Sequence, residues 1–340
     1  MPIQHAKSPC CQEIIYRFGS RRRQCRACGR TWRIRRKKTG RKPKRSSVRL
    51  PQKLADYGRI TAWAKINHIS ASTASERLSS ALYRFLKQTR RLPRGPYALL
   101  GDGLYFKFKR MDWVMYIMAV KPVRSCKAYF LDPVLLQGKE SYERWRQAMT
   151  TIPEATKKCI LAFVSDGFRG SKLVAREHGW VHQRCHFHLL MALIRRRGRR
   201  SYRIKGAGIR EKLLGVVRVL LTTTNETALR TQKLKAQRLL ANPLCPPWIR
   251  KQTIEFLCKL DDFRAYLMYP ELHLPATTNS IESAGKLIRK TTSTARTPQS
   301  VLLRATAFLR LKKSIVCNGK FQPSFPNHPK IFLFSNETAN

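Results

Sequence analysis

Leu99-Leu100-Gly101-Asp102-Gly103 is an apolar run that ends in an aspartate followed by glycine, and Ala162-Phe163-Val164-Ser165-Asp166-Gly167 ends in the same way, with its aspartate 64 residues later. Short apolar runs bounded by turn residues predict buried strands. Open α/β sheets place their sites at the carboxyl ends of strands, where we expect both acids to lie. Asp-Gly is also a frequent turn pair, so one such ending would indicate only a turn. Two of them, in the two most apolar strands, favour a functional pair.

The residues around these runs predict an α/β sheet with a crossover. The chain changes from β-forming to helical patterns in an order that gives strands at 97–103, 104–109, 113–120 and 126–131, a helix at 142–149, a strand at 159–165, a helix at 171–178 and a short strand near Trp180. We therefore expect the first part of a core at 97–189, an all-helical insertion at 190–274, C-terminal core helices at 275–317 (about 280–291 and 300–312) and an irregular tail at 318–340.

The composition indicates a polyanionic partner. The 340 residues include 69 Lys and Arg against 19 Asp and Glu, a formal charge of +50, with 43% hydrophobic residues. That apolar content excludes a disordered polycation, and a compact fold with so much charge repels itself unless a polyanion is bound. The longest apolar runs, such as Trp113–Val120, are shorter than the roughly 20 residues that span a bilayer. The chain opens without a secretory pattern, so we expect an intracellular protein that binds nucleic acid and no membrane.

The first 32 residues predict a zinc ribbon. Cys25 and Cys28 have the spacing of a zinc knuckle. Cys10 and Cys11 are adjacent, and neighbouring side chains are expected to diverge too much for both to bind one ion. We therefore expect one of them to bind, with His5 as the fourth ligand. A ribbon that folds without metal is the alternative, although so short a segment needs a staple.

Two further segments separate the ribbon from the core. Residues 33–50 form a basic linker with ten Lys or Arg between Arg33 and Arg49. Such a run is either a solvated linker or a phosphate-binding arm, and both can hold together. Residues 51–93 resemble a helix-turn-helix with Ser70 or Ser72 as an N-cap, a pattern that any small helical bundle shares. Within the linker, the residues expected to contact DNA are Arg35, Arg36, Lys37 and Lys38.

A third acid, Glu282, has two interpretations. With Asn279 as N-cap it completes a capping box, and it forms an i,i+4 pair with Lys286. Lys286, Arg289 and Lys290 also make one basic helix face with the acid at its start. Carboxylates gather where divalent metals bind, and such metals meet phosphate held by cations, so this face is expected to contact DNA.

The three acids together resemble a known family. Asp102, Asp166 and Glu282, with gaps of 64 and 116 residues, resemble the D-D-E set of transposases with an RNase H-like core. Cys185 and His188 form a CxxH after the second acid, which resembles the C/D(2)H signature of the Mutator-like insertion-sequence transposases. The stretch Thr277–Ser283 around the third acid resembles that group as well.

The resemblance implies a function. Asp102, Asp166 and Glu282 would bind two Mg²⁺ ions, or Mn²⁺, for cleavage and transfer of DNA strands. Cys185 and His188 would support the core or bind zinc; their alternative is ordinary packing under the sheet. The partners would be double-stranded DNA at terminal inverted repeats and at a target, bound by a dimer or larger assembly in the cytoplasm, at the bacterial nucleoid. A domesticated DNA-binding protein and a metal-dependent nuclease on the same fold remain the alternatives.

Overall fold

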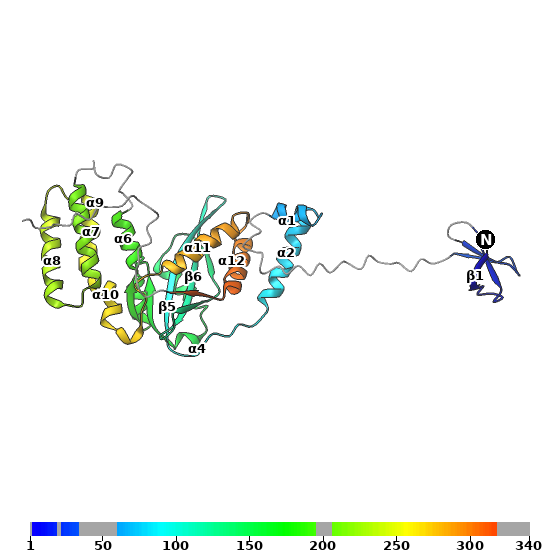
Figure 1. The fold of residues 1–340 in the computed structure, drawn as a ribbon, viewed down its shortest axis with the longest axis horizontal. Helices are drawn as coiled ribbons and strands as arrows, with labels where there is room; N and C mark the ends of the chain where they lie inside the picture. The colour runs from blue at the N-terminus through cyan, green and yellow to red at the C-terminus, as the bar shows by residue number, and fades with distance from the viewer. Residues whose placement is uncertain (1, 19–21, 34–59, 195–205, 318–340) are drawn as a thin grey trace, which may run out of the picture. The chain divides into compact units, whose positions relative to one another are not determined.

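The computed structural model describes residues 2–18, 22–33, 60–194 and 206–317, and at positions 2–6, 62 and 63 it describes the backbone alone. The chain divides into two compact units, Met1–Arg49 and Leu50–Asn340, which we describe separately (Figure 1). Most of the expected basic linker, with Arg35, Arg36, Lys37 and Lys38, lies outside the described residues, as does the expected tail at 318–340.

The first unit is a small antiparallel sheet. Its strands follow chain order: β1 (Pro2–Lys7), β2 (Ile14–Phe18), β3 (Arg22–Cys25) and β4 (Thr31–Arg33). Among its described side chains, Ile15 and Cys25 are the buried hydrophobic ones. So few apolar contacts stabilise the unit weakly by themselves, which is the situation in which small domains use a metal.

The second unit is built on a mixed seven-stranded sheet flanked by helices, an α/β fold as the sequence predicts. The sheet order is β10-β9-β5-β6-β7-β11, with β8 paired to β6. The pairs β5·β9 and β9·β10 are parallel and the others antiparallel. Its strands are β5 (Tyr97–Phe108), β6 (Met111–Pro122), β7 (Lys127–Phe130), β8 (Val134–Gln137), β9 (Ile160–Ser165), β10 (Val181–Arg184) and β11 (Ser314–Val316).

Helices cover both faces of this sheet. Along β5, Tyr97 and Leu99 pack with α3 (Tyr142–Met149) and α5 (Ser171–Glu177). Ala98 and Leu100 pack instead with α11 (Asn279–Thr292) and α12 (Pro298–Lys312). This alternation follows from the period of two in a strand, and two covered faces explain why the strand reads as a continuous apolar run.

The structure differs from the sequence prediction at β5. The two strands expected at 97–103 and 104–109 are one strand, so Asp102 lies within a strand and not at its end. Other groups approach the glycines on either side of Asp102 so closely that a larger residue would not fit there. A Cβ on Gly101 would lie 2.8 Å from the ring of Trp145 on α3. The glycines therefore mark close packing rather than a turn.

A helical cluster follows β10. Its members are α6 (His186–Ile194), α7 (Ala207–Thr222), α8 (Glu226–Ala241), α9 (Pro247–Cys258) and α10 (Leu260–Met268). They share an apolar core of their own, distinct from the two cores on the sheet. A short 3₁₀ turn, η4 (Pro270–Leu272), leads from this cluster to α11.

Two helices precede the sheet, α1 (Ile60–Ile66) and α2 (Ala71–Leu86), while α4 (Glu154–Lys157) is a single turn before β9. Ser70 is the N-cap of α2, where its side chain accepts a hydrogen bond from Thr73 N. Leu82 of α2 packs against Leu303 and Ala307 of α12. Within the described parts of the chain, we find no helix with the length and apolarity needed to cross a bilayer.

Candidate metal centres

Strand pairing brings Asp102 and Asp166 together. Strands β5 and β9 are parallel, and Leu100 lies opposite Val164. Asp102 follows Leu100 by two residues, and Asp166 follows Val164 by two residues. Both acids continue the alternation that turns Leu100 and Val164 toward α11. The pairing register therefore places two carboxylates side by side on the α11 face.

His188 joins the two acids. One ligand atom from each of Asp102, Asp166 and His188 lies within 4.8 Å of the others. One oxygen of each carboxylate is held by the backbone, Asp102 Oδ1 by Gly103 N at 3.0 Å and Asp166 Oδ1 by Phe168 N at 3.1 Å. The remaining oxygens and an imidazole nitrogen form a set that can bind a divalent cation. Carboxylate oxygens suit Mg²⁺ or Mn²⁺, whereas imidazole favours Mn²⁺ or another transition metal.

The acids of this site lie close together, and this shifts the pKa values of Asp102 and His188. Burial and the negative charge of Asp166, with smaller effects of Glu282 and Glu140, raise the pKa of Asp102 to about 7. Burial lowers the pKa of His188, but Cys185, Asp102 and Asp166 outweigh it and raise that pKa to about 9. Among the described ion pairs, Asp102 and Asp166 have no Lys or Arg partner within 4 Å. Without a metal, the protonated His188 supplies the positive charge beside the two acids, and a bound cation would take the place of its proton.

Glu282 comes from α11 and lies outside the group of three. Its negative charge acts on Asp102. Glu282 Oε1 pairs with Lys286 Nζ at 3.4 Å, while Oε2 is buried without a hydrogen-bond partner. The expected capping box is wrong: the N-cap is Thr278 and not Asn279, and no side chain caps the helix. The pair with Lys286 is thus the one part of the local interpretation that remains, and it leaves Oε2 without a partner, which fits a site that accepts a cation.

The two residues of the CxxH, Cys185 and His188, contact different parts of the site. Cys185 is fully buried, and its sulfur accepts a hydrogen bond from the backbone N of Thr278 at 3.2 Å, at the start of the helix that carries Glu282. Its partner His188 faces the carboxylates. His186, which lies between Cys185 and His188 in the sequence, is buried with its Nε2 2.6 Å from the carbonyl of Phe263 on α10.

A buried polar chain behind the site was missed in the sequence. Ser165 Oγ lies 3.3 Å from His182 Nε2, and Asp262 Oδ2 lies 3.9 Å from His182 Nδ1. Asp262 also accepts a hydrogen bond from Lys172 at 2.8 Å. Because Ser165 directly precedes Asp166, this chain connects α10 to the strand end that carries the second acid. No sequence pattern indicates this chain, since its members come from four separate elements.

Glu140 was also missed. It lies in the loop between β8 and α3, where its carboxylate accepts hydrogen bonds from Tyr105 Oη and Trp145 Nε1, both at 2.8 Å. Burial and then the charge of Asp166 raise its pKa. The one available signal was the scarcity of acids in the chain, because Glu140 otherwise stands directly before an ordinary N-cap serine.

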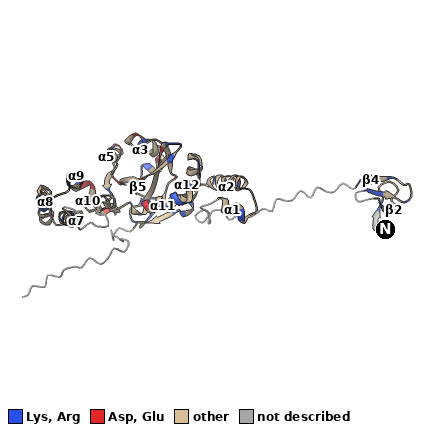
Figure 2. Cartoon of the chain, turned by 90° about the horizontal axis from the view of Figure 1, so that it is seen from above, with Lys and Arg blue, Asp and Glu red and all other residues tan. Residues whose placement is uncertain are grey.

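The basic face of α11 is only partly free to contact a ligand. Arg289 donates to the carbonyl of Tyr105 at 2.7 Å and stacks over Phe106, so it holds α11 against β5. Lys286 and Lys290 are exposed. Figure 2 shows acidic segments in red near α11 and β5, beside the blue basic positions of α11.

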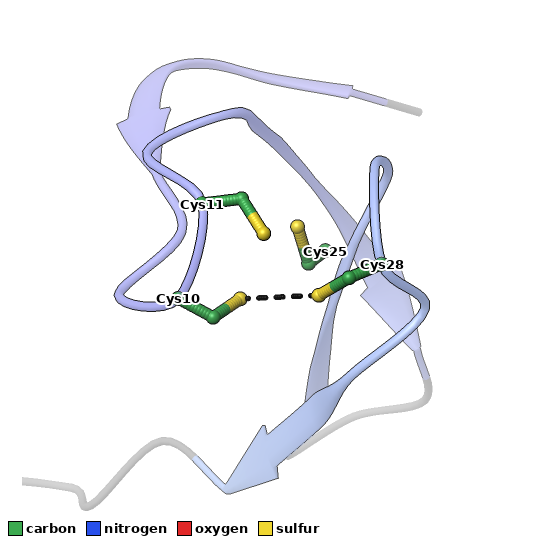
Figure 3. A group of neighbouring side chains, drawn as sticks. All are labelled: Cys10, Cys11, Cys25 and Cys28. Carbon is green, nitrogen blue, oxygen red and sulfur yellow. Dashed lines mark hydrogen bonds between the residues drawn. The ribbon is translucent and has the colours of Figure 1, made fainter.

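The first unit holds a second candidate centre. The sulfur atoms of Cys10, Cys11, Cys25 and Cys28 all lie within 4.8 Å of one another and point toward a common centre (Figure 3). Four thiols at this spacing can bind zinc tetrahedrally. A hydrogen bond with Ser8 and further backbone hydrogen bonds lower the pKa of Cys25 to about 6. The neighbouring Cys28 raises the pKa of Cys11 to about 12, as expected for crowded thiols that lack a cation.

The expectation that only one of Cys10 and Cys11 can face the ion is wrong. Both lie in the turn between β1 and β2, where the backbone curls and Gln12 has a positive φ of 53°. Consecutive side chains diverge in a strand but can converge in such a turn. His5 lies in β1, and its side chain is outside the described part of the structure; the four cysteines supply a complete ligand set without it.

Comparisons with known proteins identify no family. No family model matches the chain, and no curated protein matches it. One solved structure that resembles it is the cryo-EM structure of a simian T-cell lymphotropic virus intasome in complex with PP2A regulatory subunit B56 gamma, at 13% identity, over 56% of this chain and 77% of that chain, with a TM-score of 0.21. A likeness of this size carries no argument, so function must be argued from the sites themselves.

Proposed function

We propose that the chain is a DNA transposase of the D-D-E type, which binds the terminal inverted repeats of an insertion sequence and cleaves and transfers DNA strands. The observation that supports it most is the approach of Asp102, Asp166 and His188, with Glu282 beside them, from four separate elements. These are the acids, and the histidine of the CxxH, that the family resemblance selects. The mixed sheet flanked by helices is compatible with an RNase H-like core.

The carboxylates define what the site does. Asp102, Asp166 and Glu282 would hold Mg²⁺ or Mn²⁺, which when bound activates water or a 3′-hydroxyl and stabilises the leaving oxygen. The chain's own residues fix the geometry: the β5·β9 register positions the aspartates, and Cys185 holds the start of α11. Lys286 and Lys290, exposed on α11, would then bind the phosphates next to the acids.

The rest of the molecule is consistent with DNA as the partner. The charge of +50 favours a polyanion, and the four cysteines would hold zinc in a small sheet followed by basic residues. Helices α1 and α2 would supply further DNA contacts. Because two DNA ends must be held together for transfer, we expect two or more copies in the DNA complex.

Strand cleavage by purified protein tests the proposal. The substrate is a supercoiled plasmid carrying the DNA that flanks the coding sequence on both sides, assayed in Mg²⁺, Mn²⁺, Ca²⁺ and EDTA. We expect cleavage at the flanking ends in Mg²⁺ or Mn²⁺, and its loss in Glu282→Gln with DNA binding retained. The matched control is Glu226→Gln, which removes an exposed charge from the first turn of α8.

Each outcome separates the proposal from its alternatives. Cleavage that is independent of the flanking ends would favour a nuclease. Binding to the flanking ends without any metal-dependent cleavage would favour a DNA-binding protein. Equal cleavage by Glu282→Gln and the control would remove Glu282 from the metal site.

A further inference from the structure

Glu140 is a half-buried acid that the catalytic set of the proposed function does not use. It comes from the loop between β8 and α3, which is anchored at both ends. Gly138, with a φ of 104°, donates its backbone N–H to the carbonyl of Asp112 at 2.6 Å, and Ser141 caps α3 by accepting from Arg144 N. The loop therefore holds Glu140 in one place rather than leaving it in solvent.

Gly103, which has no side chain, leaves room for the carboxylate of Glu140 next to β5. A Cβ on Gly103, the residue after Asp102, would lie 2.7 Å from Glu140 Oε1. The carboxylate thus contacts β5 next to Asp102, and it approaches from the α3 face while Asp102 lies on the α11 face. Gly103 has no positive φ, so backbone conformation does not require a glycine there. The close approach of Glu140 explains it.

The two side chains that contact Glu140 do not require its charge, although the charge of His188 acts favourably on it. Tyr105 and Trp145 each donate to it, but a neutral glutamine could serve both, since the tyrosine hydroxyl also accepts. No Lys or Arg among the described ion pairs contacts Glu140, and Asp166 lies close enough for its charge to act on it. A further anion beside Asp102 and Asp166 costs free energy unless they share a cation.

We propose that Glu140, held next to β5 by Gly103, Tyr105 and Trp145, is an additional carboxylate of the divalent-metal site of Asp102 and Asp166. This rests on the metal site of the proposed function and adds a residue to it. A carboxylate with two of its lone pairs used by donors still has two to accept hydrogen bonds from metal-bound water or to bind the ion itself. Glu140 is thus a positioning residue for the ion and raises the affinity for it.

Binding of Mn²⁺ to the full chain tests this without any activity assay. Free Mn²⁺ is followed by its electron paramagnetic resonance signal as protein is added. We expect Glu140→Gln to weaken binding about 10- to 100-fold, as loss of outer-shell partners does. Gly103→Ala, which displaces the carboxylate and leaves its charge, should weaken it similarly. The matched control Glu143→Gln removes an exposed acid three residues along and should bind as the unmodified chain does.

A structural role for Glu140 predicts the opposite pattern. Glu140→Gln would then lower the melting temperature of the metal-free protein and leave Mn²⁺ affinity unchanged. We expect the reverse, a melting temperature that is kept or raised because repulsion is relieved, with weakened binding. If Glu140→Gln does not fold, the same two measurements, Mn²⁺ affinity and melting temperature, are made on Gly103→Ala.

Asp166→Asn separates this inference from the proposed function. If Asp166→Asn loses Mn²⁺ binding while Glu140→Gln and Gly103→Ala bind as tightly as the Glu143→Gln control, the role of Glu140 is refuted and the D-D-E site stands. If Asp166→Asn binds as tightly as the unmodified chain, the metal site itself is wrong and both proposals fail.

Discussion

Asp102→Asn should stabilise the metal-free protein, and more so at pH 8 than at pH 5. Burial and Asp166 raise the pKa of Asp102 from 3.8 to about 7. A carboxyl whose pKa is raised by folding contributes stability that is fully present below its unfolded pKa, near 4, and is lost as the pH rises through 7. Asparagine does not titrate, and its side-chain oxygen can still accept the hydrogen bond from Gly103 N.

The size of the effect follows from the shift. Each pKa unit corresponds to about 1.4 kcal/mol, so between pH 5 and pH 7 the unmodified protein loses up to about 3 kcal/mol relative to the variant. Asp102 is only half-buried, and water screens part of this interaction. We therefore expect the gap in unfolding free energy to widen by about 1–3 kcal/mol between pH 5 and pH 8. His188, with a pKa of about 9, stays charged at both pH values.

Urea unfolding in EDTA at the two pH values measures this gap. Saturating Mn²⁺ should then reverse the order at pH 8, because only the unmodified site gains binding free energy. A gap that is equal at pH 5 and pH 8, or larger at pH 5, would refute the reasoning that Asp102 is held at an electrostatic cost.

Three other substitutions test separate parts of the molecule. Cys28→Ser should release the one zinc ion that we expect per chain, measured by atomic absorption, whereas the exposed Cys258 can be changed to Ser without loss of metal. Gly101→Ala should cost about 1–3 kcal/mol in urea unfolding, because the added methyl group would lie 2.8 Å from the Trp145 ring; an unchanged midpoint would contradict that packing. Asp262→Asn should cost about 1–3 kcal/mol at pH 7, since burial raises the pKa of this carboxyl but the neighbouring His182 and Lys172 outweigh burial and lower it. This cost should shrink as the pH falls below about 4, where the depressed pKa no longer favours the folded state, and an equal cost at pH 3 would argue against it.

The sequence predicted the order of elements well where the patterns were long. Both apolar strands, the flanking helices and the N-cap Ser70 agree with the structure. The short edge strands β8 and β11 were missed, because three or four residues carry too little periodicity. The position of Asp102 within β5 was also missed, since glycine in a strand has the same sequence signature as a turn.

The candidate sites could be predicted only where chemistry is repeated in the sequence. Asp102, Asp166 and the cysteines were selected by such repetition, whereas Glu140 depends on how one loop meets Gly103 across the sheet. The capping box at Asn279 was wrong for a related reason. Local helix rules favoured it, but the helix starts where the backbone of Thr278 bonds to Cys185, a contact between residues far apart in the chain.

The parallel pairing of β5 with β9 has a consequence for the order of folding. Parallel strands cannot form a hairpin, so Leu100 and Val164 meet only after the chain between them has been arranged, a slow type of contact. Before that step Asp102 and Asp166 are far apart and bind no ion jointly. The proposed metal site would thus be completed late, and we expect a divalent cation to leave the folding rate nearly unchanged and to slow unfolding instead. An ion that binds this way would slow the loss of the native state without speeding its formation.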